Sequence, residues 1–260
     1  PTRRSSDLGT LLPFYSMFIM GTYDSYKLFQ FNGLPSNYLM QNLQTVLKTD
    51  LLVFFKNSGI VSFCSIILGL LSCSLCGYGL SKYRFKGRNF LYKLVLFTMM
   101  VPVQLGIVAY VWEMRILHLN NTLVPSIIPF VFMGFGTFWM TQYIRDAVPN
   151  EIIESARIDS AGEFRIFFSI ITRLISPAYL TLGLLIFIWS WNGFFIPLIT
   201  LSNAKLYTLP LGMASFNGMY MTDNGAKILA LSLATLPVLI VYIFAANSFM
   251  SGLTAGAVKG

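Results

Sequence analysis

The sequence predicts an all-α fold, a polytopic bundle of membrane-spanning helices, on two observations. Of the 260 residues, 55% are hydrophobic and only 11% are charged, whereas a soluble domain carries about a quarter charged residues. The apolar residues also gather in runs long enough to cross a bilayer, which takes about 20 residues of helix. Because a backbone in lipid must satisfy its own hydrogen bonds, such runs are expected to be helices. This composition excludes an ordinary soluble protein and a disordered chain alike.

Six apolar segments follow one another along the chain, which predicts six transmembrane helices. They run over residues 8–20, 58–80, 94–112, 123–140, 177–201 and 226–250. The last five are long enough to span a bilayer. Four of them contain a proline that is expected to kink the helix, namely Pro102, Pro129, Pro197 and Pro237. The first segment is too short to span, so we expect the first helix to be truncated.

The first eight residues, Pro1 to Leu8, resemble the translation of a common sequencing adapter. We therefore expect residues 1–8 to be an artefact, which leaves residues 9–260 as the transmembrane domain. The alternative is a genuine basic flank of the first helix, because Arg3 and Arg4 lie in this segment.

Lysine and arginine residues predict the orientation of the helices. The short loop after the second segment contains five basic residues and no acidic one: Lys82, Arg84, Lys86, Arg88 and Lys93. The loop after the fourth segment contains Arg145, Arg157, Arg165 and Arg173. Because basic loops stay on the cytoplasmic side, we expect both loops and both termini there. Orientation is a sufficient reason for these basic loops, so membrane lipid is an expected partner and nucleic acid is not.

The residues that could bind a metal or catalyse a reaction are few. Cys64, Cys73 and Cys76 share one apolar run, where a packing role is favoured over a metal site. His118 is the single histidine, and no lysine follows a glycine, so the chain contains no phosphate-binding P-loop. We therefore expect no catalytic residue, no metal and no cofactor in this chain.

The most informative segment covers residues 142–177, whose pattern predicts a helix–turn–helix at the membrane surface. Asn150 can cap a first helix that ends near Asp159. Ser160 and Glu163 have the spacing of a capping box, which predicts a second helix. Four apolar residues at helical spacing predict one face of that helix: Phe164, Phe167, Phe168 and Ile171. Such an element either anchors the fold at the interface or docks a cytoplasmic partner.

The string Glu154-Ser155-Ala156-Arg157-Ile158-Asp159-Ser160-Ala161-Gly162 resembles the EAA loop of bacterial ABC-importer permeases, whose pattern is E-A-A-x-x-D-G-A. Further strings resemble the sugar-importer branch of that family, at residues 191–198, 207–212 and 251–260. The resemblance covers residues 9–260 and is strongest to the second permease subunit of maltose-type carbohydrate importers.

Three residues depart from the family pattern: Ser155, Ser160 and Arg173 replace alanine, glycine and proline. Because serine disfavours a left-handed turn, we expect the capping box at Ser160 to break the helix in a different way. The replacement of proline by Arg173 puts the start of the fifth span in question.

The resemblance implies a permease subunit of an ATP-driven, binding-protein-dependent sugar importer in the bacterial inner membrane. This chain would form half of the pore beside a second homologous permease subunit. Two ATPase subunits would bind ATP and magnesium, and an extracytoplasmic sugar-binding protein would deliver the substrate. The residues expected to couple the chain to an ATPase are Glu154, Ser155, Ala156, Asp159, Ser160, Ala161 and Gly162.

Uncharged sugars are usually held by hydrogen-bonding groups and aromatic faces. The candidates of this kind for the substrate path are Gln104, Trp189, Trp191, Asn192 and Asn247. The alternative is that these side chains pack and cross-bond helices. The outward loop over residues 215–224 either reaches the binding protein or is a simple connector.

Two other functions would each require sequence features of their own. A stand-alone secondary transporter or channel would need an ion site or an internal repeat, and the sequence contains neither pattern. A membrane-embedded enzyme would need acids, histidines or cysteines converging at one membrane face, which the scattered residues of this chain do not provide.

Overall fold

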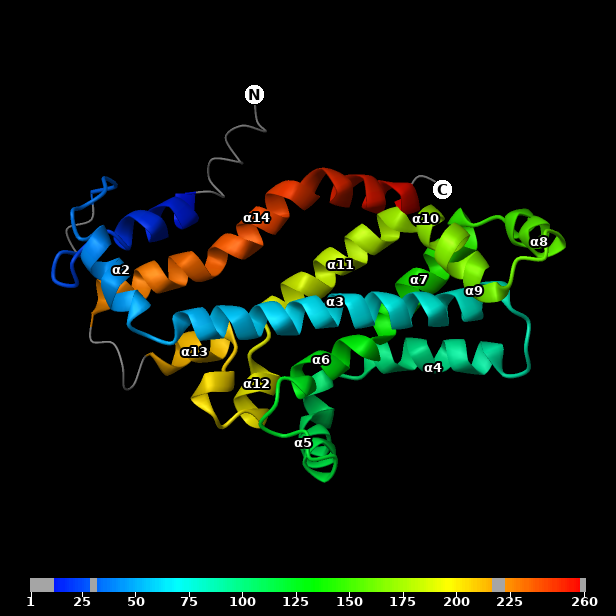
Figure 1. Ribbon diagram of the computed structural model, residues 1–260, viewed down its shortest axis with the longest axis horizontal. Coiled ribbons are helices and arrows are strands. Elements are labelled where there is room, and N and C mark those ends of the chain that lie inside the picture. Colours follow the sequence, from blue (N-terminus) through cyan, green and yellow to red (C-terminus); the bar gives the residue numbers. More distant parts are fainter. Residues whose placement is uncertain (1–11, 29–31, 217–222, 258–260) are drawn as a thin grey trace.

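The computed structural model describes residues 12–28, 32–216 and 223–257, and every regular element in those ranges is helical (Figure 1). The all-α fold class is therefore confirmed. Residues 12–20, within the predicted first segment, are helical. The adapter-like segment 1–8 and most of the loop over residues 215–224 lie outside the described residues.

The helices are named in chain order. They are α2 (Leu39–Leu47), α3 (Leu51–Lys82), α4 (Arg88–Met100), η2 (Val103–Gly106), α5 (Ile107–Ile116), α6 (Val124–Val131), α7 (Gly134–Ala147), α8 (Asn150–Ile158), α9 (Glu163–Arg165), η3 (Ile166–Ile171), α10 (Thr172–Leu174), α11 (Ser176–Trp191), α12 (Phe195–Thr200), η4 (Ala204–Leu206), α13 (Leu209–Ser215) and α14 (Asn224–Ala257). The element η3 is a π-helix, whereas η2 and η4 are 3-10 helices.

Within the described residues, three stretches are long and apolar enough to cross a membrane alone, Leu51–Lys82, Val124–Ala147 and Asn224–Ile243. Two bent pairs of helices pass the same test together, Arg88–Met100 with Gln104–Ile116 and Glu163–Leu174 with Ser176–Trp191. The bundle of membrane helices is thus confirmed, and the count of six stays a prediction.

The long helix α3 forms the axis of the bundle, with α6, α7 and α11 packed along it (Figure 1). Small residues allow this close approach. A Cβ atom at Gly77 would lie 2.8 Å from Met140 Cβ, and one at Gly136 would lie 2.6 Å from Cys73 Sγ. Cys73 is therefore a buried packing residue between α3 and α7. Small residues at such contacts are typical of helix pairs in membranes.

Several predicted spans are broken rather than gently kinked. The third turns by 90° between α4 and α5, where Pro102 cannot donate a backbone hydrogen bond. The fifth, predicted to be continuous over residues 177–201, ends at Trp191 and resumes at Phe195. The expected kink at Pro197 is wrong, because this proline lies in the first turn of α12, where its missing N–H costs little. The chain between α11 and α12 is thus free to line a cavity.

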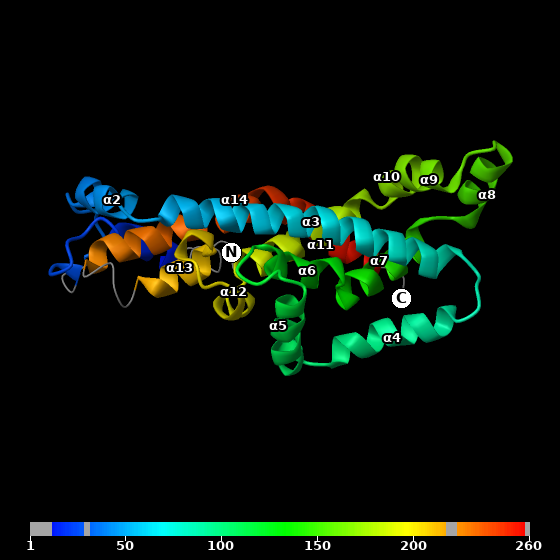
Figure 2. The ribbon, with the colours of Figure 1, turned by 60° about the horizontal axis from the view of Figure 1, so that its bottom comes forward.

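The loops predicted on opposite sides of the membrane lie at opposite ends of α3. Near its start, Asn57 donates to the carbonyls of Lys205 and Tyr207, each at 2.9 Å. Its last residue, Lys82, donates to the carbonyl of Val148 at 2.5 Å. Both views place α8 at the far end of the molecule, beyond the last turn of α3 (Figures 1 and 2). This arrangement agrees with the predicted grouping of loops, and the side that faces the cytoplasm stays a prediction.

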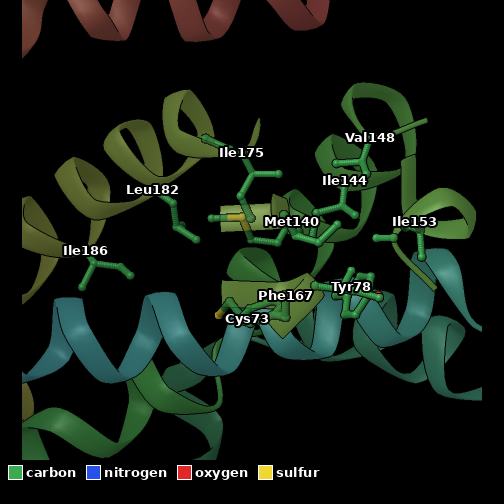
Figure 3. Close-up of a cluster of buried hydrophobic side chains, with 14 residues drawn as sticks. Cys73, Tyr78, Met140, Ile144, Val148, Ile153, Phe167, Ile175, Leu182 and Ile186 are labelled. Carbon is green, nitrogen blue, oxygen red and sulfur yellow. The ribbon is translucent and has the colours of Figure 1, made fainter. Parts of the chain in front are cut away.

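Two apolar cores fill the bundle. One lies at the α8 end and unites side chains of α3, α7, α8, η3 and α11 (Figure 3). Its members include Met140, Ile144, Ile153, Phe167 and Leu182. The other lies at the opposite end, around Phe54 and Trp191. Since the first core is continuous from α11 into α8, the segment after α7 is an integral part of the bundle.

Candidate functional site

Residues 149–175 form the hairpin that the sequence predicts, with α8 as its first arm. Asn150 was expected to cap this arm, and that expectation is wrong. Pro149 holds the cap position, Asn150 is the first helical residue, and its Oδ1 atom accepts a hydrogen bond from Lys82 Nζ at 3.2 Å. Lys82 thereby joins the end of α3 to the start of the hairpin. The first arm ends at Ile158, with Asp159 as its C-cap, as predicted.

The turn after α8 corrects the predicted capping box. Ser160 has φ = 61°, in the left-handed region that serine was expected to avoid. The N–H of Ala161 donates to the carbonyl of Ala156, and the N–H of Ser160 donates to that of Arg157, each at 3.0 Å. These two bonds are the Schellman arrangement that ends helices at a left-handed residue. Ser160 therefore takes the conformation for which the family pattern has glycine, at a cost in backbone strain.

Glu163 does not reach back to Ser160 but holds the hairpin to α3. Its Oε1 atom accepts from Arg157 Nε at 2.7 Å. Its Oε2 atom accepts from the hydroxyls of Tyr78, at 3.1 Å, and Tyr83. The Arg157 guanidinium also lies over the Tyr83 ring, 5.6 Å from its centroid. We call Tyr78, Tyr83, Arg157 and Glu163 the clamp.

The electrostatics of the clamp favour the charged form of Glu163. Hydrogen bonds from Arg157, then from Tyr83 and Tyr78, hold the pKa of this carboxyl below its ordinary value. A lowered carboxyl pKa adds stability that is fully present above the ordinary pKa and is lost as the pH falls through the lowered one. Burial and the bond to Glu163 raise the pKa of Tyr83, so its hydroxyl remains a donor at neutral pH.

The second arm of the hairpin departs from the predicted helical face. Phe167 and Ile171 are buried, but Phe164 is 79% exposed and Phe168 is exposed as well. The reason is the π-helix over Ile166–Ile171, whose wider turn replaces the spacing of three and four residues. The inward residues are instead Ile166, Phe167 and Ile171.

The predicted coupling residues fall into two groups. Glu154, Ser155, Asp159, Ser160 and Gly162 are exposed on the hairpin. Ala156 is buried and Ala161 is partly buried, and both contact the core below. Their small size therefore serves the approach of α8 to its own bundle. The structure also shows two exposed apolar side chains on the hairpin, Ile158 at 83% and Phe164 at 79% exposure.

Three of the five candidates for the substrate path line one cavity of about 580 Å³: Gln104, Trp189 and Asn192. Its other walls include Phe130, Phe194 and Ser190. Ser126 and Thr208 line it too, and their hydroxyl oxygens are buried without a hydrogen-bond partner. Cavities of this size with aromatic walls and few polar groups are typical of small-molecule sites.

The two remaining candidates are not brought to this cavity. Trp191 is buried in the second core, where its Nε1 atom donates to the carbonyl of Ala234 at 3.3 Å. Its ring packs against Phe55 and Phe187. This is the packing role that the sequence left open. Asn247 lies in the part of α14 after residue 243, where side chains are outside the described part of the chain.

Comparisons with known proteins agree with this architecture. Residues 64–253 match the protein family described as "Binding-protein-dependent transport system inner membrane component". The chain is 37% identical over 207 residues to the arabinooligosaccharides transport system permease protein AraQ of Bacillus subtilis (strain 168). This match covers 80% of this chain and 73% of AraQ. It is 28% identical over 258 residues to the diacetylchitobiose uptake system permease protein DasC of Streptomyces coelicolor. This match covers 97% of this chain and 93% of DasC.

Solved structures with a similar fold include the crystal structure of a bacterial ABC transporter involved in the import of the acidic polysaccharide alginate. The TM-score is 0.82 at 23% sequence identity, and the match covers 94% of this chain and 92% of that one.

Proposed function

Because the chain belongs to the family of inner membrane components of binding-protein-dependent transport systems, we propose that it is a permease subunit of an ATP-driven sugar importer. In this proposal it forms half of the pore beside a second permease. Two ATPase subunits and an external sugar-binding protein complete the importer. The sugar class is carried over from the relatives, whose names refer to arabinooligosaccharides and diacetylchitobiose.

The observation that carries the proposal is the construction of the hairpin. It extends beyond α3 at one end of the molecule, yet its buried side chains belong to the core of the bundle (Figures 2 and 3). An element that only anchored the protein at a lipid surface would not need a shared core. A projecting element with a shared core is suited to pass movement from a partner into the helices.

The exposed surface of the hairpin specifies the chemistry of that partner. Glu154 and Asp159 present carboxylates, and Ile158 and Phe164 present apolar side chains on the same hairpin. A complementary cleft needs an apolar floor and cationic or N–H donors at its rim. In the proposal this cleft belongs to an ATPase subunit, which also supplies all the chemistry of ATP hydrolysis. Closure of two such subunits would rock the bundles between inward-open and outward-open states.

The cavity around Trp189 is the proposed segment of the sugar path. Its aromatic walls can contact sugar faces, and Gln104 and Asn192 can exchange hydrogen bonds with sugar hydroxyls. The break between α11 and α12 supports this role, because irregular backbone at membrane depth is tolerated where it lines a cavity.

The substitution Glu154→Lys tests the coupling role in the assembled importer. It reverses the charge of one exposed docking residue without touching the core. We expect binding-protein-stimulated ATP hydrolysis to fall about tenfold or more, as for a lost charge pair at an interface, while the permease stays in the membrane.

The matched control is Glu113→Lys, which makes the same charge change at an exposed position of α5. It should leave the stimulation unchanged. Normal stimulation of the Glu154→Lys importer would contradict the coupling role.

A further inference from the structure

We propose that the hairpin moves α3 through the clamp, with Glu163 as the positioning residue of the transmission. This inference rests on the proposed function and names a route that the order of the chain does not suggest. In the sequence the hairpin leads directly into α11, so α11 is the obvious helix to move. In space, the polar connections of the hairpin run to α3.

The direct connection to α11 is bent. The segment Glu163–Leu174 meets α11 at 80°, and Ile175 between them lies outside both helices. Among the described residues, no side-chain hydrogen bond joins the hairpin to α11. Across the bend, backbone bonds join the N–H of Ile175 to the carbonyl of Ile171 and the N–H of Tyr179 to that of Ile175, each at 3.0 Å. The side chains in contact there are apolar, such as Ile171, Ile175 and Ala178. Apolar contacts are non-directional, so they fix the relative position less firmly than bonded groups do.

The connection to α3 is directional and occurs at two places. At the start of the hairpin, Lys82 Nζ donates to the carbonyl of Val148 and to Asn150 Oδ1. At the turn, Glu163 accepts from Tyr78 and Tyr83 on one oxygen and from Arg157 on the other. Four of these five bonds link the hairpin, or the residue directly before it, to the last turns of α3 or to the residue that follows α3.

Glu163 is the common acceptor at the turn. The Tyr78 and Tyr83 rings meet edge to face at 5.3 Å, and Tyr78 also packs on Phe167 at 5.7 Å. These contacts hold both hydroxyls toward one carboxylate oxygen. Arg157 comes from the arm that carries the docking acids, so Glu163 connects that arm to α3. Hydrogen bonds to charged groups are about twice as strong as neutral ones, which suits a contact that must transmit force.

The test is the substitution Glu163→Gln in the complete importer, reconstituted in lipid vesicles with its partner permease, its ATPase subunits and its binding protein. The amide removes the charge and keeps the shape of the side chain. We expect assembly and basal ATP hydrolysis to be unchanged and the stimulation by sugar-loaded binding protein to fall about tenfold. A merely structural role would lower assembly or basal hydrolysis instead of the stimulation ratio.

The charge swap Arg157→Glu with Glu163→Arg separates the ion pair from the bonds to α3. The double variant restores the ion pair with reversed sign but leaves no carboxylate at position 163 to accept from Tyr78 and Tyr83, so its stimulation should stay low. Full recovery in the double variant would show that the ion pair alone suffices and would overturn the clamp. If Glu163→Gln does not assemble, Tyr83→Phe removes one hydroxyl only, and normal stimulation in that variant would overturn the clamp.

The outcomes separate this inference from the proposed function. A wild-type complex without ATP-driven sugar uptake overturns the proposed function and the clamp with it. If the wild-type complex takes up sugar and the Glu163→Gln complex shows normal stimulation of ATP hydrolysis, the clamp alone is overturned.

Discussion

Two regions at opposite ends of the bundle, the clamp and the cavity, differ in how their polar side chains are paired. At the hairpin end, Glu163 accepts three hydrogen bonds and Lys82 is bonded to the start of the hairpin. At the cavity end, the hydroxyl oxygens of Ser126 and Thr208 are buried without a partner. A buried unpaired hydroxyl costs free energy that a paired one does not. The clamp therefore has one well-determined arrangement, whereas these two hydroxyls of the cavity can gain hydrogen bonds by rearranging.

This difference matches the two proposed tasks. A segment that receives movement from an ATPase must keep its shape, and a segment that releases sugar must change its contacts during the transport cycle. In this account, a part of the bundle is rigid where its polar side chains all have hydrogen-bond partners, and adaptable where some of them have none. Three pairs of substitutions test this contrast, in order of decreasing effect.

The largest effect is expected for Phe167→Ala at the hairpin end. Phe167 is only 2% exposed, and truncating a buried phenylalanine costs about 3–5 kcal/mol. The amides of residues 150–171 should lose the corresponding protection from hydrogen exchange in the assembled importer. The control is Phe168→Ala, the exposed neighbour, which should change protection little. Equal effects of the two substitutions would contradict a hairpin built into the core.

Smaller effects on stability are expected at the cavity end, where two substitutions should change the stability in opposite directions. Ser190 Oγ is bonded to Ser62 Oγ at 3.0 Å, so Ser190→Ala should lower the stability by about 1–2 kcal/mol. Thr208→Val removes an unpaired hydroxyl of a residue that is 2% exposed, and should leave the thermal midpoint unchanged or raise it. Its sugar uptake should nevertheless fall, because Thr208 lines the cavity that is proposed as part of the sugar path.

Thermal unfolding and uptake by the same purified importer measure both properties. A lower thermal midpoint for Thr208→Val than for Ser190→Ala would show that Thr208 is paired, and would remove the contrast between the two ends.

The smallest effect is expected at the turn of the hairpin. Ser160→Gly relieves the left-handed strain, and we expect a gain of about 0.5 kcal/mol after the loss of chain entropy is counted. Ser155→Gly makes the same change inside α8 and should instead cost about 0.5 kcal/mol. Hydrogen exchange of the α8 amides compares the two. A loss of stability in Ser160→Gly would contradict the left-handed conformation.

The sequence predicted much of the fold because the signals are local. The apolar runs predicted a bundle of membrane helices. The string from Glu154 to Gly162 located the hairpin and the end of its first arm at Asp159. The identity of the hairpin came from a resemblance, since helical spacing alone left an interfacial anchor open.

The errors share a physical cause, which is that long-range contacts override local patterns. Asn150 and Glu163 have the residue types of helix caps, but Lys82 and Tyr78 offer them stronger partners that are distant in the chain. The π-helix changes the repeat that would have placed Phe164 beside Phe167. The grouping of Gln104 with Trp189 and Asn192 also depends on packing that no local spacing reveals.

The central claim is that the exposed tip of the hairpin contacts an ATPase subunit, and site-specific photo-cross-linking tests it most directly. A benzophenone amino acid at position 158, where Ile158 is 83% exposed, should form an adduct with the ATPase in the native membrane. The same amino acid at position 112, where Trp112 is exposed on α5, should form none. An adduct at position 158 alone is the result that the account predicts. Adducts from both positions, or from position 112 alone, would contradict it.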